Sequence, residues 1–294
     1  MMAQVLSAIR PRGAFLALGT LDQAVLLTIP VVLLYGAIDW YVSVPVSILT
    51  MAALLFPRVR VNRWLWFVAA CFLLSGAFVA WARADNHKYL IAYWTLALAL
   101  AAGARRPDDQ IALSARLLVG LTFAFALLWK LLTPDFINGE FFHYSLLFDS
   151  RFSAKVVALG GLGHDAAHVN RLARAAITSP TSLLVSAPIA TTSAIATLAA
   201  MLTTWTLAIE ALVAGTFLVP RSWRIAAVRD GALIAFTVTA YAVAPVLGFA
   251  SVLTAMGFVQ CERDRVWTRS AYLLLFLAIQ CFRIPWTMLL DSGS

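Results

Sequence analysis

Two ionisable residues stand inside long apolar stretches of the chain, where a charge is costly. Lys130 lies near the end of the stretch from Ile111 to Leu132, and Glu210 lies within the stretch from Ala196 to Val219. An ionisable side chain in such a setting needs a partner and is a functional-site hypothesis by default. A lysine removed from water can act as a base or hold an anion, so Lys130 and Glu210 are the candidate catalytic residues.

Further polar and aromatic residues stand close to Lys130 in the sequence. A Pro-Asp turn follows the lysine, and a glycine and a carboxylate come after it, so we take Trp129, Asp135 and Glu140 as candidate substrate-binding residues. Arg283 stands in the last apolar stretch and is a fourth candidate. We expect it to neutralise a carboxylate such as Glu210.

The same lysine and glutamate also have a purely structural interpretation. Lys130 lies four residues before Pro134, and a long basic side chain near a helix end usually extends to the membrane interface. Glu210 can serve as a hydrogen-bond partner between two helices. The sequence leaves the functional and the structural interpretations open.

A pair of histidines has the spacing of metal ligands. His164 and His168 stand four residues apart, and residues at i and i+4 share one face of a helix, which lets both bind one metal ion. His143 lies upstream. The zinc-protease motif has a glutamate where this chain has Asp165, whose shorter side chain reaches a bound water poorly. The alternative is that the pair forms the surface of an amphipathic helix.

The composition indicates which solvent surrounds these residues. The chain has 294 residues, of which 62% are hydrophobic and only 12% charged, whereas a soluble domain has about a quarter charged residues. This charge is too little to cover a surface in water, so lipid must surround most of the chain. The net charge of +8 comes from arginines clustered between apolar stretches, which is typical of a membrane protein and argues against nucleic-acid binding.

The lengths of the apolar stretches predict an all-α polytopic transmembrane bundle. A spanning helix needs roughly 20 mostly apolar residues, and about nine segments approach this length. The shorter ones, such as Leu247–Gln260, could be re-entrant. The nine are Ala24–Trp40, Val42–Phe56, Trp64–Trp81, Tyr89–Ala102, Ile111–Leu132, Ala196–Val219, Ala232–Val246, Leu247–Gln260 and Ala271–Leu290.

The positions of the basic residues predict the orientation. With nine segments and a cytoplasmic N-terminus, the arginine clusters all fall on one side, as the positive-inside rule requires. We expect residues 1–294 to form one transmembrane domain in the bacterial inner (plasma) membrane, in contact with the lipid bilayer. Residues 133–192 would be an extracytoplasmic loop and form a partly helical cap, with an amphipathic helix at Gly163–Ile177.

Two segments carry a resemblance to a known group of membrane proteins. One is the apolar helix that ends in Lys130, followed by an aromatic, Gly139 and Glu140; the other runs from Thr203-Thr204-Trp205 to Glu210, with Pro220 and Arg221 after it. Together they resemble the HTTM and DoxX-like proteins, which include vitamin K-dependent γ-carboxylase. The two segments cover well under half of the chain, and the large lumenal domain of the carboxylase has no counterpart here.

The resemblance implies a membrane factor that binds an amphiphilic partner at its outer face. A quinone, a lipid or an exported peptide would bind near Lys130 and Glu210, and the protein would be an accessory subunit of a modification or secretion pathway. The second hypothesis is a membrane enzyme of carboxylase-like or quinone-dependent type, with Lys130 as the base. The third is a secondary transporter in which Glu210 and Arg283 relay coupling ions.

Overall fold

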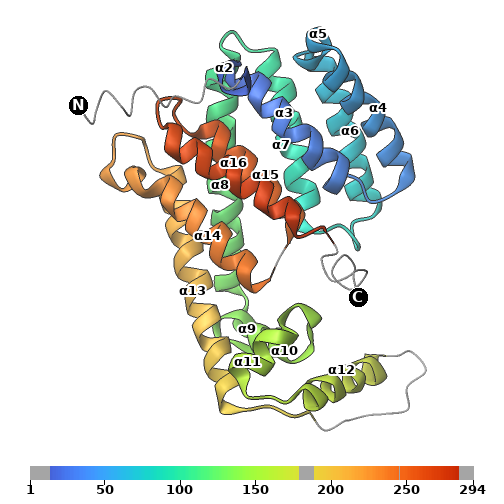
Figure 1. Ribbon diagram of the computed structural model, residues 1–294, viewed down its shortest axis with the longest axis vertical. Coiled ribbons are helices and arrows are strands. Elements are labelled where there is room, and N and C mark those ends of the chain that lie inside the picture. Colours follow the sequence, from blue (N-terminus) through green and yellow to red (C-terminus); the bar gives the residue numbers. More distant parts are fainter. Residues whose placement is uncertain (1–13, 179–188, 245, 285–294) are drawn as a thin grey trace, which may run out of the picture. The chain divides into compact units, whose positions relative to one another are not determined.

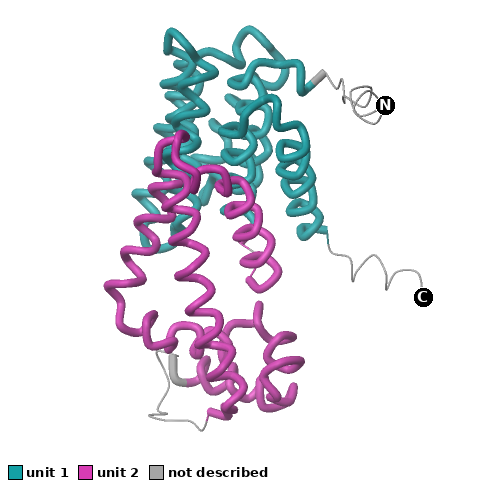
Figure 2. The backbone as a smooth tube through the Cα atoms, turned by 90° about the vertical axis from the view of Figure 1, so that its left-hand side faces the viewer, with its two compact units in different colours: residues 1–119, 247–294 teal, residues 120–246 magenta. Residues whose placement is uncertain are grey.

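The computed structural model describes residues 14–178, 189–244 and 246–284, and within these ranges it is built from helices with no strand (Figure 1). The predicted all-α fold is therefore confirmed. Residue contacts divide the chain into two compact units, coloured separately in Figure 2. Unit 1 comprises Met1–Val119 and Leu247–Ser294, unit 2 comprises Gly120–Val246, and the boundary falls within helix α8 (Pro107–Leu132).

Unit 1 is a helical bundle built from the N-terminal part of the chain and two helices near its C-terminus. Besides the first part of α8, its helices are α2 (Ala14–Ala17), α3 (Thr20–Tyr35), α4 (Trp40–Leu55), α5 (Pro57–Arg60), α6 (Arg63–Val79), α7 (Asn86–Ala102), α15 (Leu247–Gln260) and α16 (Val266–Cys281). Helix α15 packs against α3, α7 and α16. Every residue of α15 from Ala250 to Gln260 is buried, as expected of a helix that is apolar on all sides.

Unit 2 continues α8 from Gly120 and adds two further long helices and a group of short ones. Helix α13 (Ser193–Leu218) packs against α14 (Arg229–Val243), which follows the short 3-10 helix η2 (Arg224–Val228). The short elements between α8 and α13 are α9 (Pro134–Ile137), α10 (Glu140–Phe148), η1 (Ser150–Phe152), α11 (Ser153–Gly160) and α12 (His164–Thr178).

The predicted loop of residues 133–192 is folded where the structure describes it. Helices α10, α11 and α12 pack on one another, and α10 and α11 also pack on α13. Together they surround a small apolar core that includes Leu147, Phe152, Val156 and Ile195. The core explains why so many apolar residues occur in a stretch that lacks a membrane-length segment. Helix α12 matches the amphipathic helix expected at Gly163–Ile177.

Each of the nine predicted segments corresponds to a helix, but length distinguishes three of them. Among the described residues, only α8, α13 and Arg224–Val243 are long and apolar enough to cross a membrane by themselves. The helices of the other six predicted segments have 14 to 17 residues. The crossing of nine segments is therefore not established by helix length. The end of the ninth predicted segment, residues 285–290, lies outside the described residues.

The first predicted segment, Ala24–Trp40, is too long at its C-terminal end. Helix α3 stops at Tyr35, and α4 begins only at Trp40. The Lys88 ammonium group donates hydrogen bonds to the carbonyl oxygens of Tyr35 and Ala37, at 2.5 and 2.9 Å. Because the last carbonyls of a helix lack partners within it, a lysine from another helix can fix where the helix ends.

Candidate functional site

Lys130 and Glu210 form a buried ion pair in unit 2. Lys130 lies in the last turn of α8 and Glu210 in the middle of α13, and the lysine Nζ lies 2.6 Å from each carboxylate oxygen. The Lys130 side chain is 21% exposed and the Glu210 side chain 7% exposed. Two residues that stand 80 positions apart in the sequence thus neutralise each other, which the cost of a buried charge requires.

An aromatic ring contributes to the environment of the Lys130 ammonium group. Nζ lies 5.3 Å from the centre of the Phe136 ring, a distance at which the negative face of a ring attracts a cation. Phe136 is buried in α9 and packs against Phe141 and Phe142 of α10, with ring centres 5.4 and 5.5 Å apart. The aromatic cluster of these three rings extends from the ion pair into the short helices of unit 2.

A glycine turn holds this aromatic cluster close to α13. Gly139 separates α9 from α10 and has a φ of 80°, in the left-handed region that glycine adopts without steric cost. A Cβ atom at Gly139 would lie 3.6 Å from Thr203 Oγ1 and 4.0 Å from the backbone of α13. The turn therefore packs against the helix that carries Glu210.

The predicted substrate-binding residues do not join the ion pair. Trp129, Asp135 and Glu140 are exposed. The two carboxylates lie in the first turns of α9 and α10, where the positive end of the helix dipole stabilises a negative charge. Arg283 belongs to unit 1. Its guanidinium lies 5.2 Å from the centre of the Tyr35 ring, and its Nη1 donates to the Leu34 carbonyl oxygen at 3.5 Å.

The ion-pair partner that the structure gives Glu210 is Lys130, where the sequence suggested Arg283. In the sequence, Arg283 and Glu210 both stand as charges within apolar stretches, and each needs a partner. The sequence does not show which helices are in contact, so the choice of partner could not follow from it. The transporter hypothesis, in which Glu210 and Arg283 relay coupling ions, stays a prediction.

The two candidate metal ligands lie on the surface of α12. His164 and His168 are both exposed, and His143 Nε2 lies 2.9 Å from Thr191 Oγ1. Within the described residues no group of three histidine, cysteine, aspartate or glutamate side chains is placed to hold a metal ion. The i, i+4 spacing agrees equally well with the solvated face of an amphipathic helix, and no third ligand lies beside the pair in the part of the chain that the structure describes.

Tyr241 is a buried polar residue of unit 2 that does not stand out in the sequence. It lies in α14, its ring centre is 6.3 Å from that of Phe236, and its hydroxyl is buried without a hydrogen-bond partner among the described residues. Buried hydroxyls rarely lack a partner. A tyrosine in an apolar stretch gives little signal in the sequence, because the ring itself is expected there.

A groove on α13 lies away from the ion pair. It has a volume of about 510 Å³ and is lined by Thr197, Ala200, Met201, Thr204, Trp205 and Ala208. These positions recur every three or four residues and share one face of the helix, whereas Glu210 shares the opposite face with Ala199 and Thr203. The groove and the ion pair are therefore two separate features of the same helix.

Comparisons of this chain with protein-family models, with curated proteins and with solved structures found no match. The site must therefore be interpreted from its own geometry, and the resemblance to HTTM and DoxX-like proteins stays a prediction. The geometry consists of a largely buried, neutralised lysine–glutamate pair, an aromatic cluster that meets the lysine through Phe136, and a tight glycine turn that packs on α13.

Proposed function

We propose that this chain is a polytopic protein of the bacterial inner (plasma) membrane, with nine membrane segments and a cytoplasmic N-terminus. Three apolar helices of membrane-spanning length support the membrane location. The alternation of arginine clusters between the apolar segments supports the orientation. In this topology the helices of residues 133–192 lie at the outer face.

Exposed tryptophans at the helix ends of unit 1 give further support. Helix α6 has 17 residues, so it is about 25 Å long, and exposed tryptophans lie at both ends of it, at positions 64 and 81. Trp40 begins α4 and Trp267 stands in the first turn of α16, and both are exposed. Tryptophan is enriched where a membrane meets water, so a helix of this length with such ends fits a bilayer.

The topology can be tested by labelling single cysteines in intact cells. In a variant with the three native cysteines replaced by serine, Leu159→Cys should react with a maleimide that cannot cross the inner membrane. Arg224→Cys should react only after the membrane is permeabilised. Both native side chains are exposed, so accessibility within the fold does not limit either reaction. Labelling of both sites from the same side would contradict the proposed number of segments.

We propose that the ion pair and the aromatic cluster bind an amphiphilic partner, in an HTTM/DoxX-like membrane factor that acts as an accessory subunit of a modification or secretion pathway. The buried Lys130–Glu210 pair carries this proposal. The pair has no net charge, yet the partly exposed ammonium group retains donor capacity, and the aromatic cluster beside it is apolar. A molecule with an uncharged polar head and an apolar body, such as a quinone or a lipid ester, fits this chemistry better than an ion does.

The enzyme hypothesis uses the same pair, and one observation favours keeping it. The 2.6 Å separation of Nζ from the carboxylate oxygens is a distance over which a proton can pass between the two groups. However, only a neutral amine has the lone pair that base catalysis needs, whereas an ammonium group serves binding directly as a hydrogen-bond donor. Binding therefore follows more directly from the geometry than base catalysis does.

Native mass spectrometry of the protein purified in mild detergent tests the binding proposal. We expect the wild-type chain to retain one amphiphile of quinone or lipid size. A variant with both Lys130→Met and Glu210→Met should lose it, because both polar groups are absent while no unpaired charge remains buried. Lys155→Met is the matched control, since this lysine of unit 2 lies on α11 and donates to the Arg151 carbonyl oxygen. Equal retention by the wild type and the double variant would reject the site.

A further inference from the structure

A second polar cluster lies in unit 1, where α16 meets the start of α3. Arg269 in the first turn of α16 is only 3% exposed. Its Nη2 donates a hydrogen bond to the Gln23 side-chain oxygen, and its guanidinium lies 4.1 Å from the centre of the Phe258 ring. Both partners are uncharged. Arginine stays protonated in proteins, so a full positive charge is buried here.

The Arg269 charge lacks an acidic counterpart. None of the ion pairs found among the described residues involves Arg269, although its neighbours Arg263 and Arg265 each have one. Its Nη1 is buried and has no hydrogen-bond partner within the same described part of the chain. Residues 1–21 contain no aspartate or glutamate, so a carboxylate side chain of that segment is not the missing charge.

A second guanidinium reaches the same end of α3. Arg263 donates from Nε and Nη2 to Thr20 Oγ1, at 3.1 and 3.0 Å, and from Nη2 to a carboxylate oxygen of Asp108 at 2.9 Å. Thr20 and Gln23 are three residues apart and therefore neighbours on the surface of α3. The two arginines are thus brought to adjacent positions of one helix.

The charges at this helix end leave one positive charge uncompensated. Asp108 faces Arg263 and also accepts a hydrogen bond from the Leu21 amide at 2.9 Å. A second carboxylate at the start of α3, that of Asp22, lies 3.9 Å from Arg60. Arg263, Asp108 and the Asp22–Arg60 pair together are neutral, so the excess charge is that of Arg269. The chemistry that completes the cluster is an anion with several acceptor oxygens.

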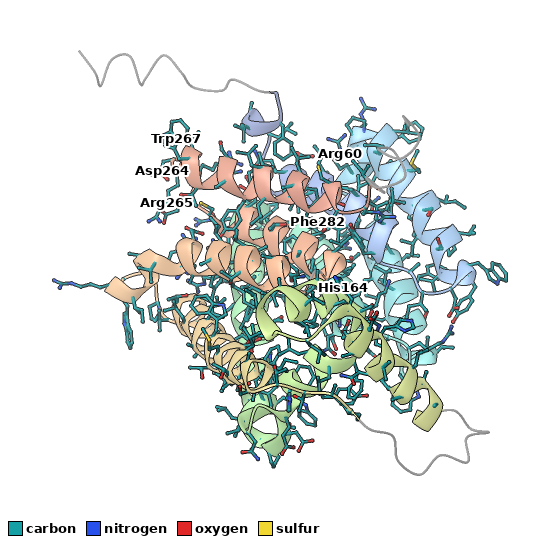
Figure 3. All side chains as sticks on the ribbon, turned by 60° about the horizontal axis from the view of Figure 1, so that its bottom comes forward. Arg60, His164, Asp264, Arg265, Trp267 and Phe282 are labelled. Atoms are coloured by element: carbon teal, nitrogen blue, oxygen red, sulfur yellow. The ribbon has the colours of Figure 1, made fainter. Side chains whose placement is uncertain are left out.

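The surroundings of the cluster indicate where this anion would come from. Trp267 stands two residues before Arg269 and is 79% exposed, and Figure 3 shows it with Arg265 at one end of α16 while Phe282 lies at the other. An exposed tryptophan beside arginines is typical of the head-group level of a bilayer. Guanidinium groups are the preferred donors to phosphate oxygens, because their planar N–H groups match the oxygens in pairs.

We propose that Arg263 and Arg269 bind a phosphate group at the start of α3, supplied by a phospholipid head group or by free phosphate. The proposal is independent of the function assigned to Lys130 and Glu210, since it uses only residues of unit 1. The bound phosphate supplies the counter-charge and the acceptor that Arg269 lacks. Thr20, already a partner of Arg263, adds a hydroxyl to the same site.

The test is thermal unfolding of the delipidated full-length chain in an uncharged detergent, at constant ionic strength. Short-chain phosphatidylglycerol and inorganic phosphate are titrated separately. We expect the unfolding midpoint of the wild type to rise with one or both, because a ligand that binds only the folded state stabilises it. In Arg269→Gln the concentration needed for the same rise should increase at least about tenfold, as expected for a lost charge-assisted contact.

Two further variants keep the result interpretable. Arg265→Gln is the matched control, because Arg265 lies at the same end of α16 but pairs with Glu262 at 3.3 Å, and it should respond as the wild type does. If Arg269→Gln does not fold, Arg263→Gln replaces it, because this side chain is half exposed and its loss leaves the buried core intact. It too should need about tenfold more ligand.

The two titrations separate the sources of the phosphate. A rise with phosphatidylglycerol alone assigns the site to a lipid head group, and an equal rise with inorganic phosphate assigns it to the free anion. The proposal is overturned if neither ligand raises the wild-type midpoint. It is also overturned if Arg263→Gln and Arg269→Gln both respond as the wild type does.

Discussion

Removing the two members of the buried ion pair one at a time should reveal an asymmetry that their burial dictates. Lys130→Met leaves the Glu210 carboxylate, 7% exposed, without its cation. Breaking a buried pair in this way costs about 3–5 kcal/mol of unfolding free energy. Glu210→Met leaves the ammonium group instead, and the Lys130 side chain is 21% exposed. A long basic side chain can extend to water, so this variant should lose only about 1–2 kcal/mol.

The double variant completes the cycle. Replacing both residues by methionine leaves no unpaired charge and keeps two apolar side chains of similar length, so its stability should lie within about 1 kcal/mol of the wild type. The losses of unfolding free energy in the two single variants then sum to roughly 3 kcal/mol or more above the loss in the double variant. An interaction energy of this size is expected only for residues in direct contact.

The assay is reversible unfolding of the four proteins in mixed micelles with increasing mole fraction of sodium dodecyl sulfate, followed by circular dichroism. The free energies of unfolding can be compared only if they fall with the same slope against the mole fraction of sodium dodecyl sulfate in all four proteins. The reasoning would be refuted if the two single variants lost equal stability and the double variant lost their sum. That result would mean that Lys130 and Glu210 contribute independently and that the pair is not formed in the membrane protein.

Two further predictions concern packing and pH. Gly248→Ala should lose about 1–3 kcal/mol of unfolding free energy, because the added Cβ would lie 2.5 Å from the buried His87 ring. Gly231→Ala is the control in the same unfolding assay. Its added Cβ would meet nothing within 4 Å, so this variant should not be destabilised. Hydrogen bonds from Arg151 hold the pKa of Asp149 below its ordinary value of 3.8. The ionised carboxylate therefore stabilises this turn above about pH 4, and the contribution is lost as the pH falls through the lowered pKa. A carboxyl titration followed by nuclear magnetic resonance should show this pKa returning toward 3.8 in Arg151→Gln; an unchanged value would show that Arg151 is not its cause.

The sequence predicts the helices better than it predicts their contacts. Apolar stretches of 14 to 24 residues identify nine of the described helices, since their length and composition depend only on local residues. The exact end of α3 could not be predicted, because Lys88, from a different helix, binds the carbonyls there. The core of α10 to α12 could be anticipated in part, since its aromatic residues are too apolar for a solvated linker.

At the candidate site, too, the sequence predicts the residues but not the contacts between them. Lys130 and Glu210 are visible in the sequence because each is a charge in an apolar stretch, but their pairing depends on which helices touch. Phe136 could have been considered as part of the site, since it follows the Pro-Asp turn beside Lys130. Arg269 could not, because in the sequence it is one of several arginines in a basic loop, and only the fold shows that its side chain is buried.

The most direct test of the proposed binding site is photo-crosslinking with an uncharged amphiphile that carries a diazirine near its polar head. The purified protein is irradiated, digested and analysed by peptide mass spectrometry. We predict labelled residues on two segments of unit 2, the one around Lys130 and Phe136 and the one around Thr203 and Glu210, and loss of this labelling in the double methionine variant. Labelling confined to the Met201 and Trp205 face of α13, and unchanged in that variant, would contradict the account by placing the amphiphile in the groove on the opposite side of the helix.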